Sequence, residues 1–315
     1  MPTSVSTDPI RPSERQAFWT EAISRSFAPV ETRPLGSGVV SGHFEFVELG
    51  AAKLVRFDSS PQCYSRDARL VSRTGSDEFM FDFQRRGRSL MRQAGNEGTI
   101  GPGHGVLYDA RRPFEDRLYG DERRTELLIA TVPTAALLRA FPAAEQYCAR
   151  AVPLSSAVGR AIAASIDAAI CDTRTGPDET DIVAWLAALL RLAAGLGHGL
   201  SRATLFGLFD AYLRANIASL APAPVIAARF GIAERTLHRV FADRETTFER
   251  HVLRLKSALL RELLGHTSLA GTSIARLAMQ CGFSDAAHAT RSFKGFYGIT
   301  PRTYREAAAD IMPLS

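Results

Sequence analysis

A chain of 315 residues is longer than a single hydrophobic core usually grows, so its length favours two domains. Hydrophobic residues make up 46% and charged residues 23% of the chain, a balance that excludes wholesale disorder. The net charge of +5 is unevenly distributed, because residues 205–305 hold 14 Lys and Arg against 7 Asp and Glu. Such a concentration of positive charge favours a carboxyl-terminal domain that contacts a polyanion.

The sequence shows no export or membrane-spanning signal. Its first residues lack a basic stretch followed by an apolar one. The apolar helical tract at residues 182–197 is interrupted by Arg191 and is shorter than the roughly 20 residues that cross a bilayer. No CxxC pair is present, so we expect reduced, mostly buried thiols at Cys63, Cys148, Cys171 and Cys281. These features predict a cytoplasmic protein without a membrane partner.

Residues 1–34 are polar and contain several prolines, which predicts a partly ordered segment with a short helix at 14–27. From residue 35 to 133 short apolar runs alternate with turn residues, a pattern typical of antiparallel strands. In the clearest strand, residues 78–84, one face carries Phe79, Phe81 and Phe83 and the other carries Met80, Asp82 and Gln84. Strands this short and this regularly punctuated predict a barrel or a sandwich.

Helical periodicity begins after Pro133 and continues through residues 134–198. Residues 178–197 form a broad apolar stripe, which either packs within its own domain or forms a dimer seam. Glycines concentrated in residues 195–203 predict an interdomain linker, placed at 199–204. The chain beyond it is predicted to be helical only.

Two windows in the last third resemble each other. In each, an alanine precedes a glycine by four residues, Ala227 with Gly231 and Ala278 with Gly282. The alanine permits a close helix crossing, and the glycine can adopt the left-handed conformation that ends a helix and redirects the chain. This is the helix-turn-helix pattern, predicted at about 224–242 and again at about 273–294.

The second helix of each window divides into an apolar and a polar face. Ser284 is predicted to cap the later one, whereas Ala233 is a poor cap for the earlier one. A capped helix at residues 247–264 separates the two units and would hold them about one DNA turn, roughly 34 Å, apart. The residues expected to face inward are Leu237, Val240, Phe241, Ala289 and Phe293.

Residues 208–305 resemble the DNA-binding domain of the AraC/XylS family of transcription regulators. The likeness is carried by Ala278, GFSD at 282–285, His288, RSFK at 291–294 and FYGITP at 296–301. Residues 35–133 are similar, less specifically, to the cupin-like sensor domains of that family, through 78–84 and 107–114. The resemblance implies an α+β chain with two domains: a sensor and dimerisation domain at 35–198 containing a cupin-like β-barrel followed by helices, and an all-α DNA-binding domain with two helix-turn-helix units at 205–307.

The resemblance also implies which side chains meet double-stranded DNA. The first unit would contribute Arg235, His238 and Arg239, and the second Ala286, Ala287, His288, Arg291 and Lys294. Arginine suits guanine readout or phosphate anchoring, and the sequence leaves both open. Local alternatives also stay open, because the two histidines could pack or cap locally and Arg291 could pair with Asp285.

The resemblance further implies an effector-responsive activator that contacts RNA polymerase, forms a homodimer and is nucleoid-associated when bound to DNA. Phe81 and Phe83 are predicted to line the pocket of a small-molecule effector of unidentified class. We expect no enzyme activity, no cofactor, and no catalytic or metal-binding residue. The alternatives are a cupin-type metal enzyme fused to a DNA-binding domain and an effector-independent regulator. The first is disfavoured because only His43 and His104 precede the linker and no HxH, GxSxG or P-loop motif is present.

Overall fold

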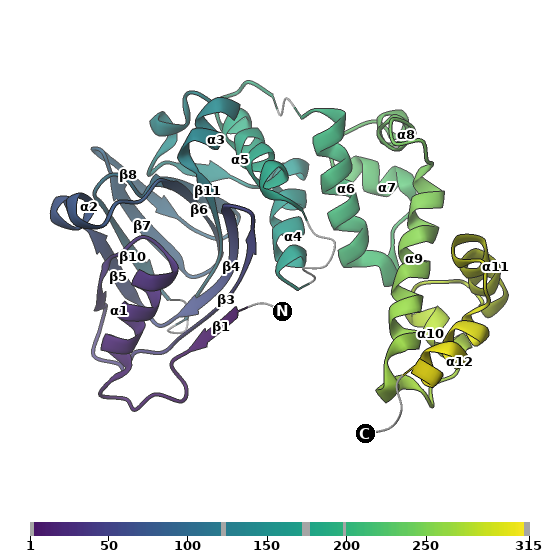
Figure 1. Cartoon of the computed structure of the whole chain (residues 1–315). Helices are drawn as coiled ribbons and strands as arrows, with labels where there is room; N and C mark the ends of the chain where they lie inside the picture. Colours follow the sequence, from purple (N-terminus) through teal and green to yellow (C-terminus); the bar gives the residue numbers. More distant parts are fainter. Residues whose placement is uncertain (1–2, 121–123, 172–176, 198–199, 312–315) are drawn as a thin grey trace. The chain divides into compact units, whose positions relative to one another are not determined.

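The structure, a computed structural model, describes residues 3–120, 124–171, 177–197 and 200–311 (Figure 1). The chain forms two compact units, Met1–Leu208 and Phe209–Ser315, here called the N-terminal and C-terminal units. Their boundary falls inside helix α6 (Arg202–Asn216) rather than in the predicted linker, of which residue 199 lies outside the described residues. Among the described helices, none has the length and apolar character needed to cross a membrane.

The described strands of the N-terminal unit form two antiparallel sheets. The larger has the order β1-β3-β4-β11-β6-β9-β12, with β1 (Thr3–Ser6), β3 (Gly42–Leu49), β4 (Ala52–Ser59), β6 (Glu78–Arg86), β9 (His104–Asp109), β11 (Thr125–Pro133) and β12 (Ala151–Pro153). The smaller has the order β2-β5-β10-β7-β8, with β2 (Glu31–Pro34), β5 (Gln62–Arg66), β7 (Arg88–Gln93), β8 (Asn96–Ile100) and β10 (Phe114–Tyr119). In this part of the chain the strands therefore make two sheets, and the cupin-like β-barrel that the resemblance implies is not confirmed.

Strand β6 lies in the middle of the larger sheet, between β11 and β9. Both of its faces are buried, because one faces the smaller sheet and the other faces helices. Alternation along the strand places Met80 on the inner face, within a core shared by both sheets, and Phe81 on the outer face. The predicted strand is confirmed and runs two residues further than expected.

Helices α3 (Thr134–Ala140), α4 (Ala157–Cys171) and α5 (Glu179–Ala193) pack against the outer face of the larger sheet (Figure 1). A capping box between Asp178 and Asp181 fixes the start of α5, since each side chain accepts from the other's backbone N–H. The predicted apolar stripe is buried from Ile182 to Leu190 against α3, β11 and β12, and is therefore used within its own unit.

Residues 3–34 are more ordered than the sequence predicts. Strand β1 pairs with β3, β2 pairs with β5, and between them lies α1 (Arg15–Ser26), close to the predicted helix. Trp19 of α1 is fully buried and its indole N–H donates to the Tyr64 hydroxyl over 3.0 Å. Apolar side chains at helical spacing anchor this polar segment, and α2 (Ala68–Thr74) adds one more short helix at the surface.

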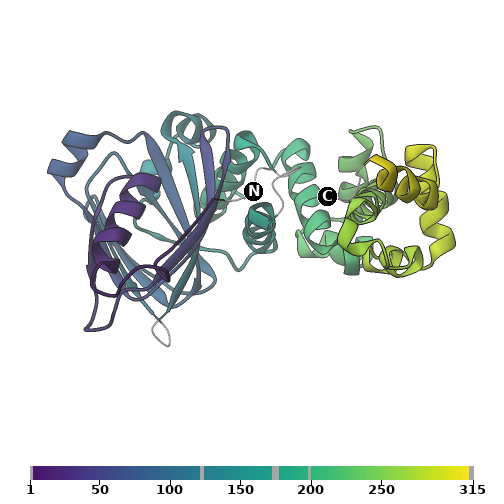
Figure 2. The ribbon, with the colours of Figure 1, turned by 60° about the horizontal axis from the view of Figure 1, so that its bottom comes forward.

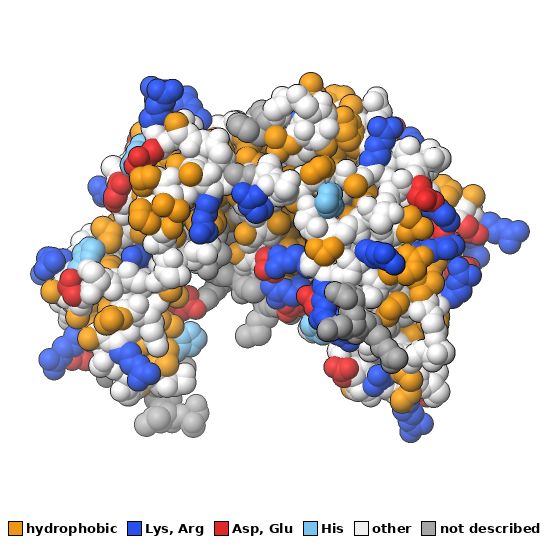
Figure 3. All heavy atoms as spheres, turned by 180° about the vertical axis from the view of Figure 1, so that it is seen from behind, with side chains coloured by type: hydrophobic (Ala, Val, Ile, Leu, Met, Phe, Trp, Pro, Cys, Tyr) orange, Lys and Arg blue, Asp and Glu red, His pale blue; other side chains and the backbone are white. Residues whose placement is uncertain are grey.

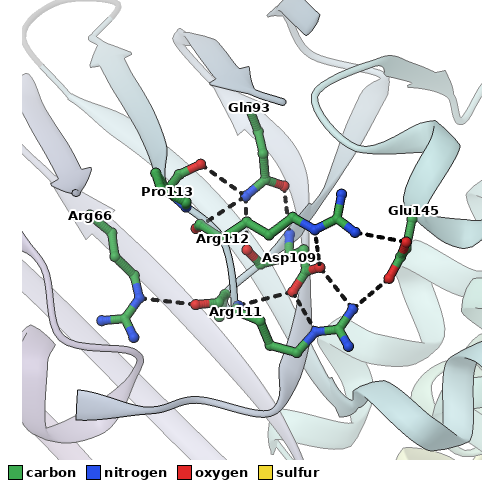
Figure 4. A network of polar contacts seen from close by, with 8 residues as sticks. Arg66, Gln93, Asp109, Arg111, Arg112, Pro113 and Glu145 are labelled. Atoms are coloured by element: carbon green, nitrogen blue, oxygen red, sulfur yellow. Dashed lines mark hydrogen bonds and ion pairs between the residues drawn. The ribbon is translucent and has the colours of Figure 1, made fainter. Parts of the chain in front are cut away.

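The segment at residues 107–114, which carries part of the family resemblance, is organised around a buried carboxylate (Figure 4). Asp109 is fully buried at the end of β9 and accepts from Arg111 over 2.9 and 3.0 Å, while Arg112 pairs with it over 3.3 Å. The same two arginines reach Glu145 of the short helix η1 (Ala144–Tyr147) at 2.7 and 2.8 Å. Hydrogen bonds to Asp109 raise the pKa of Arg111. Both arginines therefore join structural elements and are not free to attract an anionic ligand.

The described secondary-structure elements of the C-terminal unit are all helices. Its elements are the end of α6, η2 (Ile217–Ser219), α7 (Ala223–Arg229), α8 (Glu234–Ala242), α9 (Phe248–Gly265), η3 (Thr267–Leu269), α10 (Ile274–Gln280), α11 (Ala286–Tyr297) and α12 (Pro301–Ile311). Helix α9 packs against α8 and also against α10, α11 and α12, so it joins the two halves of this unit (Figure 1). Phe209, Phe230 and Phe241 form the core of the first half, with ring centroids 4.4 to 6.0 Å apart.

Candidate DNA-binding surface

Helices α7 and α8 form the first helix-turn-helix unit, as predicted. Ala227 is 1% exposed at their crossing, and Gly231 adopts φ +65° in the turn. The backbone N–H of Ile232 donates to the carbonyl of Ala227 over 3.1 Å, which closes the end of α7. Ile232, which follows the glycine, is only partly buried.

Helices α10 and α11 repeat this arrangement 51 residues later. Ala278 is fully buried, Gly282 has φ +78°, and the N–H of Phe283 donates to the carbonyl of Ala278 over the same 3.1 Å. Phe283 is buried, and the Lys256 ammonium of α9 donates to the carbonyl of Gly282 while lying 5.8 Å from the Phe283 ring centroid. The second turn is thus held from the central helix.

Helices α8 and α11 differ in the residue that caps their first turn. Ala233 stands before α8 without a side-chain cap, as expected. Helix α11 is capped by Asp285, whose carboxylate accepts from the His288 backbone N–H over 2.7 Å, and not by Ser284 as the sequence predicted. That backbone hydrogen bond lowers the pKa of Asp285, and the nearby Arg291 contributes less to the same effect. A stronger cap therefore begins the second recognition helix.

Helix α8 buries Leu237, Val240 and Phe241 and turns its opposite face outward. Arg235 and Arg239, one helical turn apart, are both exposed. His238 is half-exposed and lies 3.6 Å from the Glu234 carboxylate on the same helix.

Helix α11 buries Ala289 and Phe293 against the core formed with α9 and α10. On its other side Ala287, Arg291 and Lys294 are exposed, and Ala286 is partly buried. His288 is turned toward the start of its helix, where Nδ1 lies 3.4 Å from the Ser284 hydroxyl and the ring meets that of Phe283 at 5.6 Å. The structure thus places the predicted residues on two outward faces, with His288 packed locally. Figure 3 shows that basic side chains are spread over the surface of the protein in this view.

A buried ionic group beneath α8 was not predicted from the sequence. His251 of α9 is 3% exposed, lies 2.6 Å from Asp210 of α6, and packs its ring 5.2 Å from that of Phe241. Burial favours a raised pKa for Asp210, but hydrogen bonds from His251 and Arg214 outweigh it and lower that pKa. The sequence did contain a signal, since His251 occupies an inward position between Phe248 and Leu255 at helical spacing.

Helix α9 separates the two helix-turn-helix units of the C-terminal unit. It begins after Thr247, whose hydroxyl caps it by accepting from the Arg250 N–H over 3.1 Å, as predicted. Its 18 residues correspond to about 27 Å at about 1.5 Å per residue.

The predicted effector residues lie elsewhere than expected. Phe81 and Phe83 are fully buried on the outer face of β6, with ring centroids 4.7 Å apart, beneath the helical layer. The cavity between the two sheets is lined instead by Met80 and Asp82 of the same strand. Phe81 and Phe83 do not line this cavity, because their face of β6 packs against helices; a role for them in effector binding stays a prediction.

Models of known protein families match residues in both the N-terminal and the C-terminal unit. The model of the AraC-binding-like domain matches residues 19–196, more than half of the chain, and the model of a helix-turn-helix domain matches residues 226–307. The HTH-type transcriptional activator RhaS of Escherichia fergusonii is 33% identical over 97 residues, which are 30% of this chain and 34% of RhaS. The transcriptional activator RhrA of Rhizobium meliloti is 35% identical over 78 residues, covering 25% of this chain and 24% of RhrA. The chain therefore matches well under half the length of these relatives.

Among solved structures, the AraC-like transcriptional activator CuxR matches with a TM-score of 0.52 and 16% identity, covering 89% of this chain and all of that one. This likeness concerns the fold and includes both units. Together with the two family models and the paired helix-turn-helix geometry, it identifies the chain as a member of the AraC/XylS family of transcription regulators.

Proposed function

We propose that this chain is a sequence-specific DNA-binding transcription regulator whose helices α8 and α11 enter successive major grooves of one duplex. The observation that supports this best is the repeated geometry of the two units. In both, a buried alanine and a left-handed glycine set the crossing, and the second helix keeps basic side chains on its outer face. Exposed arginines on a helix that fits the major groove supply both phosphate anchoring and base readout.

In the first unit, Arg235 and Arg239 carry the proposed contacts. They stand four residues apart, so both point from the same side of α8. A guanidinium in the groove can donate two hydrogen bonds to O6 and N7 of guanine, and one at the edge can hold a phosphate. His238 lies on α8 next to Arg239 and would contact DNA with the part of its ring that does not face Glu234.

In the second unit, small side chains lie at the start of the helix. Ala286 and Ala287 let the α11 backbone approach the bases closely and offer methyl groups for contact with thymine. Arg291 and Lys294, exposed one and two turns later, would supply base or phosphate contacts. His288 contributes mainly by fixing the start of α11, given its contacts with Ser284 and Phe283.

The length of α9 supports readout of neighbouring turns. About 27 Å of helix, with Phe241 of α8 packed near its start and Phe293 of α11 packed near its end, suits the roughly 34 Å repeat of B-DNA. One polypeptide would then protect about two turns of duplex.

The N-terminal unit would act as a cupin-like sensor of a small molecule and as the dimerisation domain. RhaS and RhrA are named as activators, which favours activation through contact with RNA polymerase. The proposed protein is a cytoplasmic homodimer that is associated with the nucleoid when it is bound to DNA. The metal-enzyme alternative is not favoured, because the helix-turn-helix family model matches this chain and the relatives RhaS and RhrA are named as transcriptional activators.

Selection of DNA fragments from a random pool by the full-length protein, followed by footprinting, tests this function. We expect one enriched site and protection of about two helical turns. Arg239→Ala and Arg291→Ala should each weaken binding to that site by about 1–3 kcal/mol if they contact bases. Arg73→Ala, which removes an exposed charge from α2, is the matched control. No enrichment, or equal losses in the control, would refute the proposal.

A further inference from the structure

The cavity between the two sheets is a feature that DNA binding leaves unexplained. The space between its atoms, measured out to its opening to solvent, is about 440 Å³. Its walls come from β4, β5, β6, β9, β10 and β11, and Ile23 of α1 and Phe27 just after it contribute to the lining. Figures 1 and 2 both show α1 lying across these strands.

The polar atoms of the cavity are few and are mostly acidic. Among the described residues that line it, only Tyr64, Asp82, Tyr108 and Asp116 carry polar side chains, and none is Lys, Arg or His. The Tyr108 hydroxyl donates to Asp82 over 3.2 Å, and the Tyr64 hydroxyl accepts from Trp19. Asp116 is 5% exposed, and its Oδ1 is buried with no hydrogen-bond partner in the described structure.

A buried carboxyl group without a partner is unfavourable, so its presence calls for an explanation. Burial raises the pKa of Asp82 to about 7, and burial together with the charge of Asp82 raises the pKa of Asp116 well above its ordinary value. The two groups therefore interact, and a cation placed between them would stabilise their ionised forms. No described side chain in the cavity wall supplies that cation.

We propose that the cavity binds a compact, mainly apolar primary amine whose ammonium group donates hydrogen bonds to Asp116 and Asp82. This inference rests on the proposed sensor function of the N-terminal unit. An ammonium group has three N–H donors and a positive charge, so it can serve both carboxylates at once. An alcohol offers one donor and no charge, and a carboxylate ligand would lose its hydration in a cavity wall that supplies no cation to pair with it.

The remaining walls suit an apolar, ring-containing body. Phe57, Met80 and Phe114 line the cavity, and the Tyr108 and Phe114 rings lie 5.0 Å apart. An aromatic ring packs against such side chains without leaving polar groups unpaired. Benzylamine, benzyl alcohol and benzoate share one ring and differ in the polar group, so together they form a matched set of probes.

Calorimetric titration and thermal denaturation of the full-length protein with these three compounds test the proposal. We expect benzylamine to bind and to raise the melting temperature, benzyl alcohol to do so more weakly, and benzoate to have no effect. Asp116→Asn should weaken benzylamine binding about ten- to hundredfold, the loss of one charge-assisted hydrogen bond. Glu115→Gln is the control, because Glu115 stands on the opposite face of β10 and pairs with Arg117 at 2.9 Å.

The amine assignment is overturned if benzylamine does not bind, if benzoate binds as tightly as benzylamine, or if Asp116→Asn binds benzylamine like the unmodified protein. Removing a buried, unpartnered carboxyl should not reduce stability. If Asp116→Asn nevertheless fails to fold, Asp82→Asn decides by the same affinity criterion.

The selected-DNA experiment keeps this inference distinct from the proposed function. A protein that enriches one DNA site but ignores benzylamine remains a regulator and loses the ligand assignment. A protein that binds benzylamine through Asp116 but selects no DNA site retains the ligand site and loses the regulatory function.

Discussion

Replacing Gly282 with alanine should destabilise the C-terminal unit through two separable effects. The residue has φ +78°, where an L-residue costs about 1–2 kcal/mol. A Cβ atom there would also lie 2.5 Å from the carbonyl oxygen of Ile217 and 2.9 Å from that of Ala218. Both contacts are with backbone, so the clash adds about 1–3 kcal/mol of strain.

Gly298→Ala is the matched control for the first effect. Gly298 ends α11 at φ +76°, and a Cβ atom there would meet nothing within 4 Å. It should therefore cost about 1–2 kcal/mol from conformation alone. The difference between the two variants isolates the contact between the second turn and η2.

Urea unfolding of the full-length variants measures both losses. The two tryptophans, Trp19 and Trp185, lie in the N-terminal unit, so their fluorescence reports that unit while far-ultraviolet circular dichroism also reports the helical one. With a slope of about 1–3 kcal/mol per molar urea, a further 2 kcal/mol in Gly282→Ala lowers the midpoint of the helical transition by about 1 M more than in Gly298→Ala. The fluorescence midpoint should not move. Equal shifts in the two variants would refute the argument from crowding.

Three further predictions concern titration, capping and salt. The folded-state pKa of Asp82 is raised to about 7, so the free energy of unfolding should fall as pH rises from about 4 to 7, by up to about 1.4 kcal/mol per pH unit. Asp82→Asn should reduce this pH dependence, and chemical denaturation at pH 5 and pH 8 measures it. Asp285→Ala should cost about 1 kcal/mol by removing the cap of α11, measured as a lower helical midpoint, with exposed Asp243→Ala, at the end of α8, as the comparison. DNA affinity should fall steeply with salt, and Lys294→Ala should reduce the slope of log K against log salt by about 1 if that side chain holds one phosphate; an unchanged slope would assign it elsewhere.

The sequence predicted the C-terminal unit more completely than the N-terminal one for a physical reason. A helix-turn-helix unit is determined by residues close together in the chain, so the spacing of Ala278, Gly282 and Phe283 already defines its hydrogen bonds. The start of α11 was placed one residue early, because both Ser284 and Asp285 can cap a helix and only the backbone conformation decides between them. His251 escaped notice because its partner, Asp210, lies 41 residues away.

Local pattern could not assign the faces of β6. Alternation separates Phe81 from Asp82, but it does not say which face meets the other sheet and which meets helices, since both are buried in this fold. The usual expectation that aromatic side chains line a ligand pocket then selected the face opposite the cavity between the sheets. The helical layer of α3, α4 and α5 covers the aromatic face, and this depends on contacts distant in sequence.

Asp82 was the more informative residue of β6 for locating a ligand site. A carboxyl group within an apolar strand is unfavourable unless it is paired, so Asp82 marks the face where something other than packing is required. Asp116 shows the same feature on β10, where it alternates with the outward-facing Glu115 and lies between buried Phe114 and Leu118. Two strands from different sheets thus each direct an acid into one cavity. Packing alone would favour apolar residues at both positions, and for this reason we regard the acid pair, rather than the aromatic face, as the determinant of ligand chemistry.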